Sequence, residues 1–113
     1  MRIDEMAIAA YENASNRGWH DSPRSIGDLI ALGHSELSEA LEAFRSRGCA
    51  AWRREDGKPE GIMSELADVV IRLGDMTELM RREGLVEQTL GEAIAEKMAF
   101  NLTRPYRHGG KIL

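Results

Sequence analysis

Apolar residues recur at steps of three and four positions along most of the chain, which is the spacing of amphipathic helices. The pattern predicts four helices, over about 3–16, 23–47, 61–82 and from 85 or 86 to 103. We expect the second helix to begin with Ser22 as its cap and Pro23 in its first turn. Gly48, Gly84 and Pro105 follow the last three helices and are typical of helix ends.

The segment CAAWRREDGKPEG at positions 49–61 is polar and contains Gly and Pro, so it predicts a mobile connection. Valine, isoleucine and threonine are too few and too scattered to indicate strands, and the Asp56-Gly57 pair lies in a polar stretch. The expected fold is therefore all-α, a four-helix bundle. It forms a single domain over 1–113 with a basic C-terminal tail at about 104–113.

The composition is that of an ordinary globular chain of 113 residues with a formal net charge of -4. No apolar run approaches the roughly 20 residues of a membrane span. The first residues, MRIDEMAIAA, do not resemble a secretory signal, so a cytoplasmic protein is expected, without membrane or nucleic-acid partners. Cys49 is the only cysteine, which excludes an intramolecular disulfide and a metal site of clustered thiolates.

Two acidic pairs lie on the second and third predicted helices, Glu36 with Glu39 and Glu65 with Asp68. At 100° per residue, the first pair lies about 80° and 140° to one side of its helix's apolar stripe. The second pair lies about 60° and 120° to the same side of its own stripe. Antiparallel packing could bring the four carboxylates together, and their repulsion would then call for protonation or a bound cation. Oxygen ligands without His or Cys favour Mg²⁺ or Mn²⁺.

A second interpretation of these acidic pairs stays open from the residues alone. Glutamate is a good helix former, and acidic pairs at this spacing are common on solvated helix surfaces. Glu42, Glu78 and Glu92 are expected to be surface residues of that kind. Asp75 could serve as a further ligand or could pair with Arg72.

The order of the acidic motifs, E-x-x-E at 36–39 followed by E-x-x-D at 65–68, resembles the MazG-type nucleoside triphosphate pyrophosphohydrolases. These enzymes belong to the all-α NTP pyrophosphatase superfamily. The stretches KPEGIMSELADVVIRLGDM and KMAFNLTRPYRHGGK are similar to those of small stand-alone MazG-like proteins. The resemblance extends over the chain from about Trp19 onward.

This resemblance implies a MazG-type fold and Mg²⁺-dependent hydrolysis of an NTP or dNTP between its α and β phosphates. The products would be the nucleoside monophosphate and pyrophosphate, in house-cleaning of the nucleotide pool. The implied Mg²⁺ ligands are Glu36, Glu39, Glu65 and Asp68. Glu39 is also our candidate for the group that orients a water molecule or takes its proton.

By the same resemblance, Lys97, Asn101 and Arg104 are candidates for contacts with the substrate's phosphates or sugar. Their spacing of four and three residues places them on one face of the fourth predicted helix. Trp19 could stack on a base or could anchor the packing of its loop. His34, on the other edge of the apolar stripe, is expected to contribute to packing rather than to catalysis.

Helices this short with broad apolar faces favour assembly into a homodimer or homotetramer, and the resemblance implies the same. An alternative function remains, a non-catalytic helical module that binds nucleotides or proteins. A di-iron carboxylate site is disfavoured because no His has a Glu three residues before it. The preferred base or sugar of a nucleotide substrate does not follow from the sequence.

Overall fold

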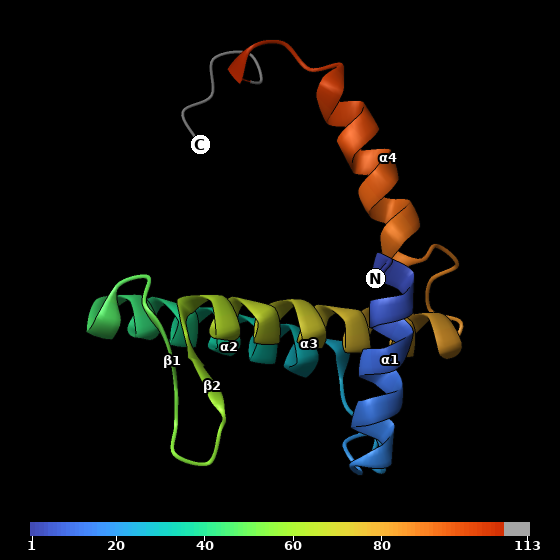
Figure 1. Ribbon diagram of the computed structural model, residues 1–113. Helices are drawn as coiled ribbons and strands as arrows, with labels where there is room; N and C mark the ends of the chain where they lie inside the picture. The colour runs from blue at the N-terminus through green and yellow to red at the C-terminus, as the bar shows by residue number, and fades with distance from the viewer. Residues whose placement is uncertain (108–113) are drawn as a thin grey trace.

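The computed structural model describes residues 1–107 and consists mainly of helices, which confirms the predicted all-α class (Figure 1). The helices are α1 (Ile3–Asn16), α2 (Ile26–Arg47), α3 (Ile62–Arg82) and α4 (Leu90–Leu102), and a small sheet is formed by β1 (Ala51–Arg53) and β2 (Pro59–Gly61). The part of the predicted basic tail at 108–113 lies outside the described residues.

Two helices begin later than the sequence predicted, and in both cases a capping residue explains the start. Helix α2 begins after Ser25, whose hydroxyl accepts the N–H of Asp28 at 3.0 Å, and not at the expected Pro23. Helix α4 begins after Thr89, which forms a capping box with Glu92. Glu92 is therefore a capping residue and not merely a solvated glutamate.

The expectation that residues 49–61 form no strand is wrong. Strands β1 and β2 pair antiparallel, with Trp52 opposite Glu60. The turn between them uses Gly57 at φ 87°, a conformation that glycine adopts without strain. Gly61, at φ 115°, ends the hairpin where a Cβ atom would lie 2.6 Å from the carbonyl oxygen of Ala50. The Asp56-Gly57 pair is thus a hairpin turn even without alternating apolar neighbours.

The core lies where α1 and α2 pack on α3. Its buried members are Leu29, Met76 and Leu79, and partly buried side chains such as Tyr11 pack against them. The close approach of α1 to α3 depends on Gly74, because a Cβ atom there would lie 2.7 Å from Sδ of Met6. The three helices therefore form one packed body.

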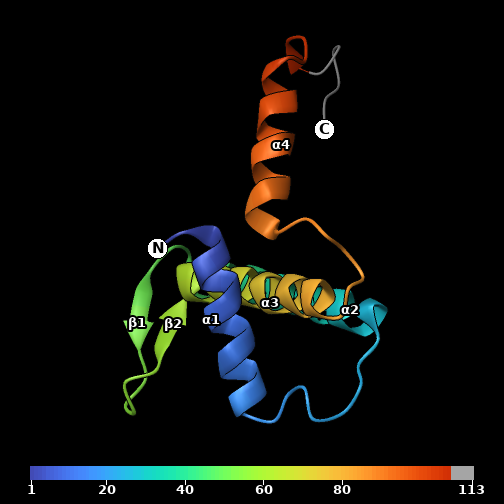
Figure 2. The same ribbon diagram turned by 90° about the vertical axis from the view of Figure 1, so that its right-hand side faces the viewer.

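Helix α4 extends away from this body (Figures 1 and 2), so the four helices do not form a closed bundle within one chain. None of the residues of α4 is buried. Its first turn is fixed to α1 by Asp4, which accepts hydrogen bonds from the Thr89 hydroxyl at 2.9 Å and from the Gly91 N–H at 2.8 Å. Within residues 1–107, no helix combines the length and the apolar character that crossing a membrane requires.

Candidate metal centre

Helices α2 and α3 run side by side in opposite directions (Figure 1), and carboxylates from both helices meet between them. Glu36 of α2 and Glu65 and Asp68 of α3 each offer one oxygen, and these oxygens all lie within 4.8 Å of one another. Glu36 and Glu65 are half-buried and Asp68 is exposed. The structure thus brings together three of the four acids that the sequence analysis singled out.

Glu39, the fourth acid, lies outside this group of three, which is the group found among residues 1–107. Its negative charge still acts on the group, because it is one of the charges that raise the pKa of Glu65. Glu39 is exposed, whereas Glu36, one turn earlier, is half-buried. It is therefore a neighbour of the three carboxylates and keeps its own oxygens accessible to solvent.

Burial raises the pKa of Glu65 above its ordinary value of 4.5, and the nearby carboxylates raise it further. The largest of these charge effects comes from Asp68, followed by Glu39, Glu60 and Glu36. A cation held among these groups would relieve the repulsion. The three carboxylate oxygens come from two helices and are the type of donor that Mg²⁺ and Mn²⁺ prefer.

An arginine already places positive charge beside this cluster. The Nε–H of Arg72 donates to Oε1 of Glu36, with 2.6 Å between the two heavy atoms. Arg72 lies one turn after Asp68 on α3 and reaches across to α2. The predicted pairing of Asp75 with Arg72 is therefore wrong, because Arg72 pairs with Glu36 instead.

Asp75 pairs with a histidine that the sequence analysis did not single out. Nε2 of His20 lies 2.6 Å from Oδ1 of Asp75, and both side chains are largely buried. The ring of Tyr11 stacks on His20 with 5.0 Å between centroids. This contact fixes the loop after α1 to α3 and so holds Trp19, the neighbour of His20, in place. No sequence period marks His20, because it lies in a loop.

A cleft of about 340 Å³ opens beside the acidic cluster. Its polar and aromatic lining includes Trp19, Arg24, Glu36, Asp68 and Arg72. The guanidinium of Arg24 lies 5.7 Å from the centre of the Trp19 ring, within the range of a cation–π contact. Two cations, an aromatic ring and two carboxylates of the cluster thus line one cleft.

The predicted substrate contacts on the fourth helix do not reach this cleft within one chain. Lys97 and Asn101 lie on α4, and Arg104 follows its end. None of the three lines the cleft among the described residues. The Lys97 ammonium instead lies 5.9 Å from the centre of the Phe100 ring on the same helix. The prediction of a shared helix is correct for Lys97 and Asn101 and wrong for Arg104, and the direction of α4 separates it from the acids.

Comparison of the chain with protein-family models, with curated proteins and with solved structures gives no significant match.

Proposed function

We propose that this protein is a Mg²⁺-dependent nucleoside triphosphate pyrophosphohydrolase with a MazG-type fold. It hydrolyses an NTP or dNTP between the α and β phosphates and releases the monophosphate and pyrophosphate. The observation that carries this proposal is the group formed by Glu36, Glu65 and Asp68, whose oxygens lie within 4.8 Å of one another at the edge of a cleft. A cytoplasmic role in house-cleaning of nucleotide pools accords with this activity.

Glu36, Glu65 and Asp68 would hold the Mg²⁺ ion, and Mn²⁺ suits the same oxygen donors. When bound, Mg²⁺ supplies positive charge that offsets the charge of the phosphates and favours loss of a proton from water. The carboxyl group of Glu65 must be ionised to act as a ligand. Because its pKa is raised, the affinity for the metal should increase as the pH rises.

Glu39 would orient the attacking water or accept its proton. It lies close enough to the cluster to affect the pKa of Glu65, yet it is exposed and outside the group of three. A carboxylate in that position can accept a proton without giving up a ligand. If it also binds the metal, as the resemblance implies, it would use one oxygen for each task.

The cleft supplies groups suited to the rest of a nucleotide. The indole of Trp19 is more than half exposed and offers a face on which a base can stack. Arg72 and Arg24 place guanidinium groups in the same cleft, where they can pair with phosphate oxygens. Lys97, Asn101 and Arg104 remain candidates for phosphate or sugar contacts, and in a homodimer or homotetramer they could act on the cleft of a neighbouring chain.

Product analysis tests the proposal most directly. The purified protein is incubated with a panel of NTPs and dNTPs, with Mg²⁺ or with EDTA, and products are separated by anion-exchange chromatography. We expect monophosphate and pyrophosphate that require Mg²⁺. Diphosphate with inorganic phosphate would contradict cleavage at the α–β bond.

Matched variants tie the activity to the cluster. Glu39→Gln and Asp68→Asn are expected to reduce turnover by at least about 100-fold, because each removes a charged group from the reacting centre. Glu42→Gln, on the exposed side of α2 where Glu42 pairs with Arg45, is the control and should keep full activity. Magnesium-dependent nucleotide binding without any product would favour the alternative, a non-catalytic nucleotide-binding module.

A further inference from the structure

The cleft beside the acidic cluster has one wall that is formed by α1. Ala10, Asn13 and Ala14 line the cleft from this helix, and their spacing of three and four residues places them on one helix face. The backbone N–H of Trp19 donates to the carbonyl oxygen of Ala14, with 3.0 Å between nitrogen and oxygen. The α1 wall and the indole at its end are therefore held together by the backbone.

The charged side chains of the described lining already have a partner or a proposed role. Glu36 and Asp68 belong to the acidic cluster, and the other charged groups pair as Arg72 with Glu36, Arg24 with the Trp19 ring, and Asp75 with His20. Asn13 is the one side chain of this lining whose polar group is neutral and both donates and accepts hydrogen bonds. It is also exposed, so a ligand can reach it.

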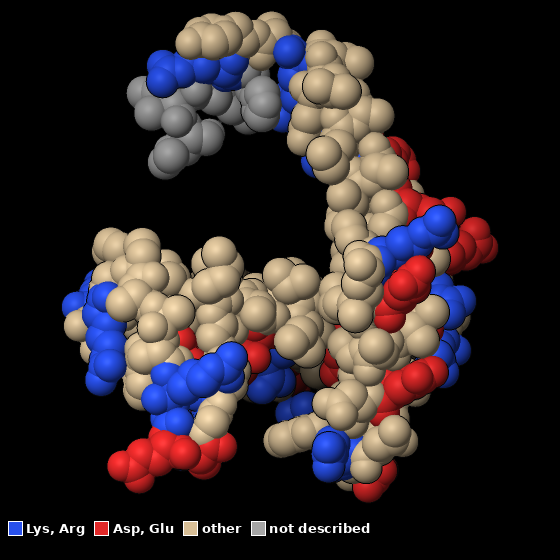
Figure 3. Space-filling model, in the orientation of Figure 1, with Lys and Arg blue, Asp and Glu red and all other residues tan. Residues whose placement is uncertain are grey.

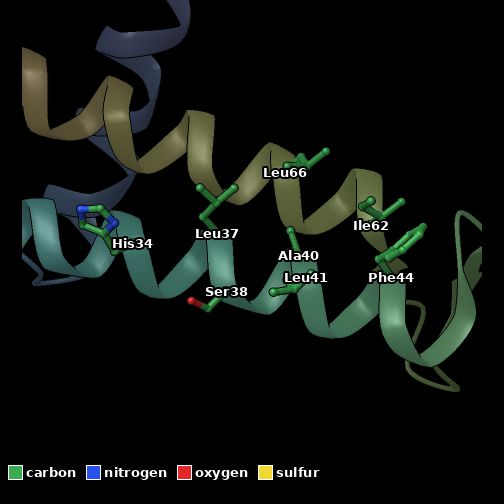
Figure 4. A pocket seen from close by; sticks show the side chains of 8 residues that line it. All are labelled: His34, Leu37, Ser38, Ala40, Leu41, Phe44, Ile62 and Leu66. Atoms are coloured by element: carbon green, nitrogen blue, oxygen red, sulfur yellow. The ribbon is translucent and has the colours of Figure 1, made fainter. Parts of the chain in front are cut away.

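A second hollow, the apolar groove between α2 and α3, does not offer a place for the base of the same nucleotide (Figure 4). Side chains such as Leu37, Leu41 and Phe44 line it, and its described lining includes none of the three acids of the proposed metal site. The cleft includes two of them, Glu36 and Asp68. Figure 3 shows acidic and basic side chains close together on the body between α1 and the hairpin, a surface that suits phosphates and a metal ion.

We infer that Asn13 determines which base the protein accepts, by hydrogen bonds from its carboxamide to the Watson–Crick edge of the base. This inference rests on the proposed function and adds a specificity-determining residue to it. Stacking on Trp19 accepts any base, whereas hydrogen bonds to the edge of a base distinguish one base from another. Ala10 and Ala14 are too small to keep a base away from the carboxamide between them.

The reach of Asn13 distinguishes large bases from small ones. Its backbone is held in α1, and the metal site and the indole would fix the phosphates and the face of the base. The Watson–Crick edge of a purine lies farther from the sugar than that of a pyrimidine. A short side chain at a fixed position therefore reaches the edge of only one size of base within hydrogen-bond distance.

Steady-state kinetics with dATP, dGTP, dCTP and dTTP in the presence of Mg²⁺ tests the inference. Asn13→Ala should change the purine-to-pyrimidine ratio of kcat/KM by at least about 5-fold, mainly through KM, because the preferred bases lose a paired contact. Asn13→Gln, which is longer by one methylene, should shift the ratio towards pyrimidines. Asn16→Ala, at an exposed site of the same helix outside the cleft, is the control and should keep the ratio of wild type.

Three kinetic results would overturn the inference. The first is a ratio in Asn13→Ala equal to that of wild type. The second is an equal loss for all four nucleotides, which would mean that Asn13 only supports the fold of α1. The third is a shift of Asn13→Gln towards purines.

Binding measurements separate this inference from the proposed activity. In a Trp52→Phe background Trp19 is the only tryptophan, so quenching of its fluorescence by the four deoxynucleoside monophosphates reports binding without turnover. A preference among bases that Asn13→Ala removes would support the contact even in a protein that hydrolyses nothing. Hydrolysis with unaltered base preference would overturn the inference and leave the proposed function in place. A protein that binds and hydrolyses none of these nucleotides would overturn both.

Discussion

Arg72 of α3 donates through Nε to Oε1 of Glu36 on α2 at 2.6 Å, and this ion pair joins the two helices beside the acidic cluster. The guanidinium partly neutralises a group of three carboxylates that would otherwise repel one another. In the proposed site a metal ion and Arg72 would therefore act on the same carboxylate, and the strength of one contact would affect the other.

Replacing Arg72 by Gln should strengthen the binding of Mg²⁺ in the absence of nucleotide. The variant leaves three carboxylates without their neighbouring cation, so a metal ion relieves more repulsion than in wild type. We expect a decrease in the apparent Kd for Mg²⁺ of about 2- to 10-fold, measured from the metal-induced rise in thermal midpoint. Arg45→Gln, which breaks an exposed pair with Glu42, is the matched control. Weaker Mg²⁺ binding in Arg72→Gln would mean that Arg72 instead orients Glu36 for the metal.

Glu65→Gln should stabilise the metal-free protein at neutral pH. Since the folded state raises the pKa of Glu65, this group favours folding below its ordinary pKa of 4.5 and loses that contribution as pH rises through its folded pKa. The amide removes the repulsion with Asp68, worth about 0.2–0.5 kcal/mol for a like-charged pair one turn apart. We expect a rise in Tm of about 1–4 °C at pH 7.5 in EDTA.

The same Glu65 variant should lose the stabilisation by Mg²⁺ that the proposed metal site predicts for the wild type. Thermal unfolding at pH 7.5 and pH 4, with and without Mg²⁺, checks both effects, and Glu42→Gln serves as the control. A variant that is less stable than wild type in EDTA would argue that Glu65 makes a favourable contact which outweighs its repulsion.

The sequence predicted the helices well because their signal is local. The apolar spacing located α1, and it located the ends of α2 and α3 closely. It missed the short hairpin because strand pairing joins residues such as Trp52 and Glu60, whose relation depends on the turn between them and not on a period. It began α4 too early because Leu85 and Val86 extend the apolar pattern towards the preceding helix, whereas the Thr89 cap sets the actual start.

The acidic site was predictable only in part, for a geometric reason. The angular position of each acid indicated which shoulder of α2 and α3 would carry it, and three of the acids do meet. Which carboxylate oxygens meet depends on how the two helices pack on each other. The sequence therefore could not show that Glu36 joins the group and that Glu39 lies outside it. Arg72 and His20 were assigned other partners or none, because their contacts are long-range in the sequence.

The sequence-based expectation for Glu78 is wrong, and the contacts of this residue give a further prediction. It was expected on a solvated surface, yet only 5% of its surface is exposed. Arg81 donates from two nitrogens to its carboxylate, and the Nε–H of Arg82 donates to Oε2 at 2.8 Å. The hydrogen bond from Arg81 is the main cause that lowers the pKa of Glu78, while burial opposes it.

Glu78→Gln should destabilise the protein at neutral pH by about 1–3 kcal/mol, because two guanidinium groups lose their common acceptor charge. A lowered carboxyl pKa contributes stability above the ordinary value of 4.5 that disappears as pH falls through the folded pKa. The difference from wild type, measured by urea unfolding, should therefore shrink below about pH 4.5. A difference that stays constant down to pH 3 would mean that packing, and not charge, accounts for the loss.

The contact of His20 with Asp75 should determine how firmly Trp19 is held in the cleft. Asp75→Ala removes the 2.6 Å partner of His20 and frees the loop after α1. In a Trp52→Phe background, where Trp19 is the only tryptophan, acrylamide quenching of the fluorescence should increase. If the proposed activity holds, KM for the nucleotide should rise about 3- to 10-fold with little change in kcat, since a looser indole stacks less well on a base. Unchanged quenching in Asp75→Ala, compared with Glu42→Ala as control, would show that packing of Tyr11 alone fixes this loop.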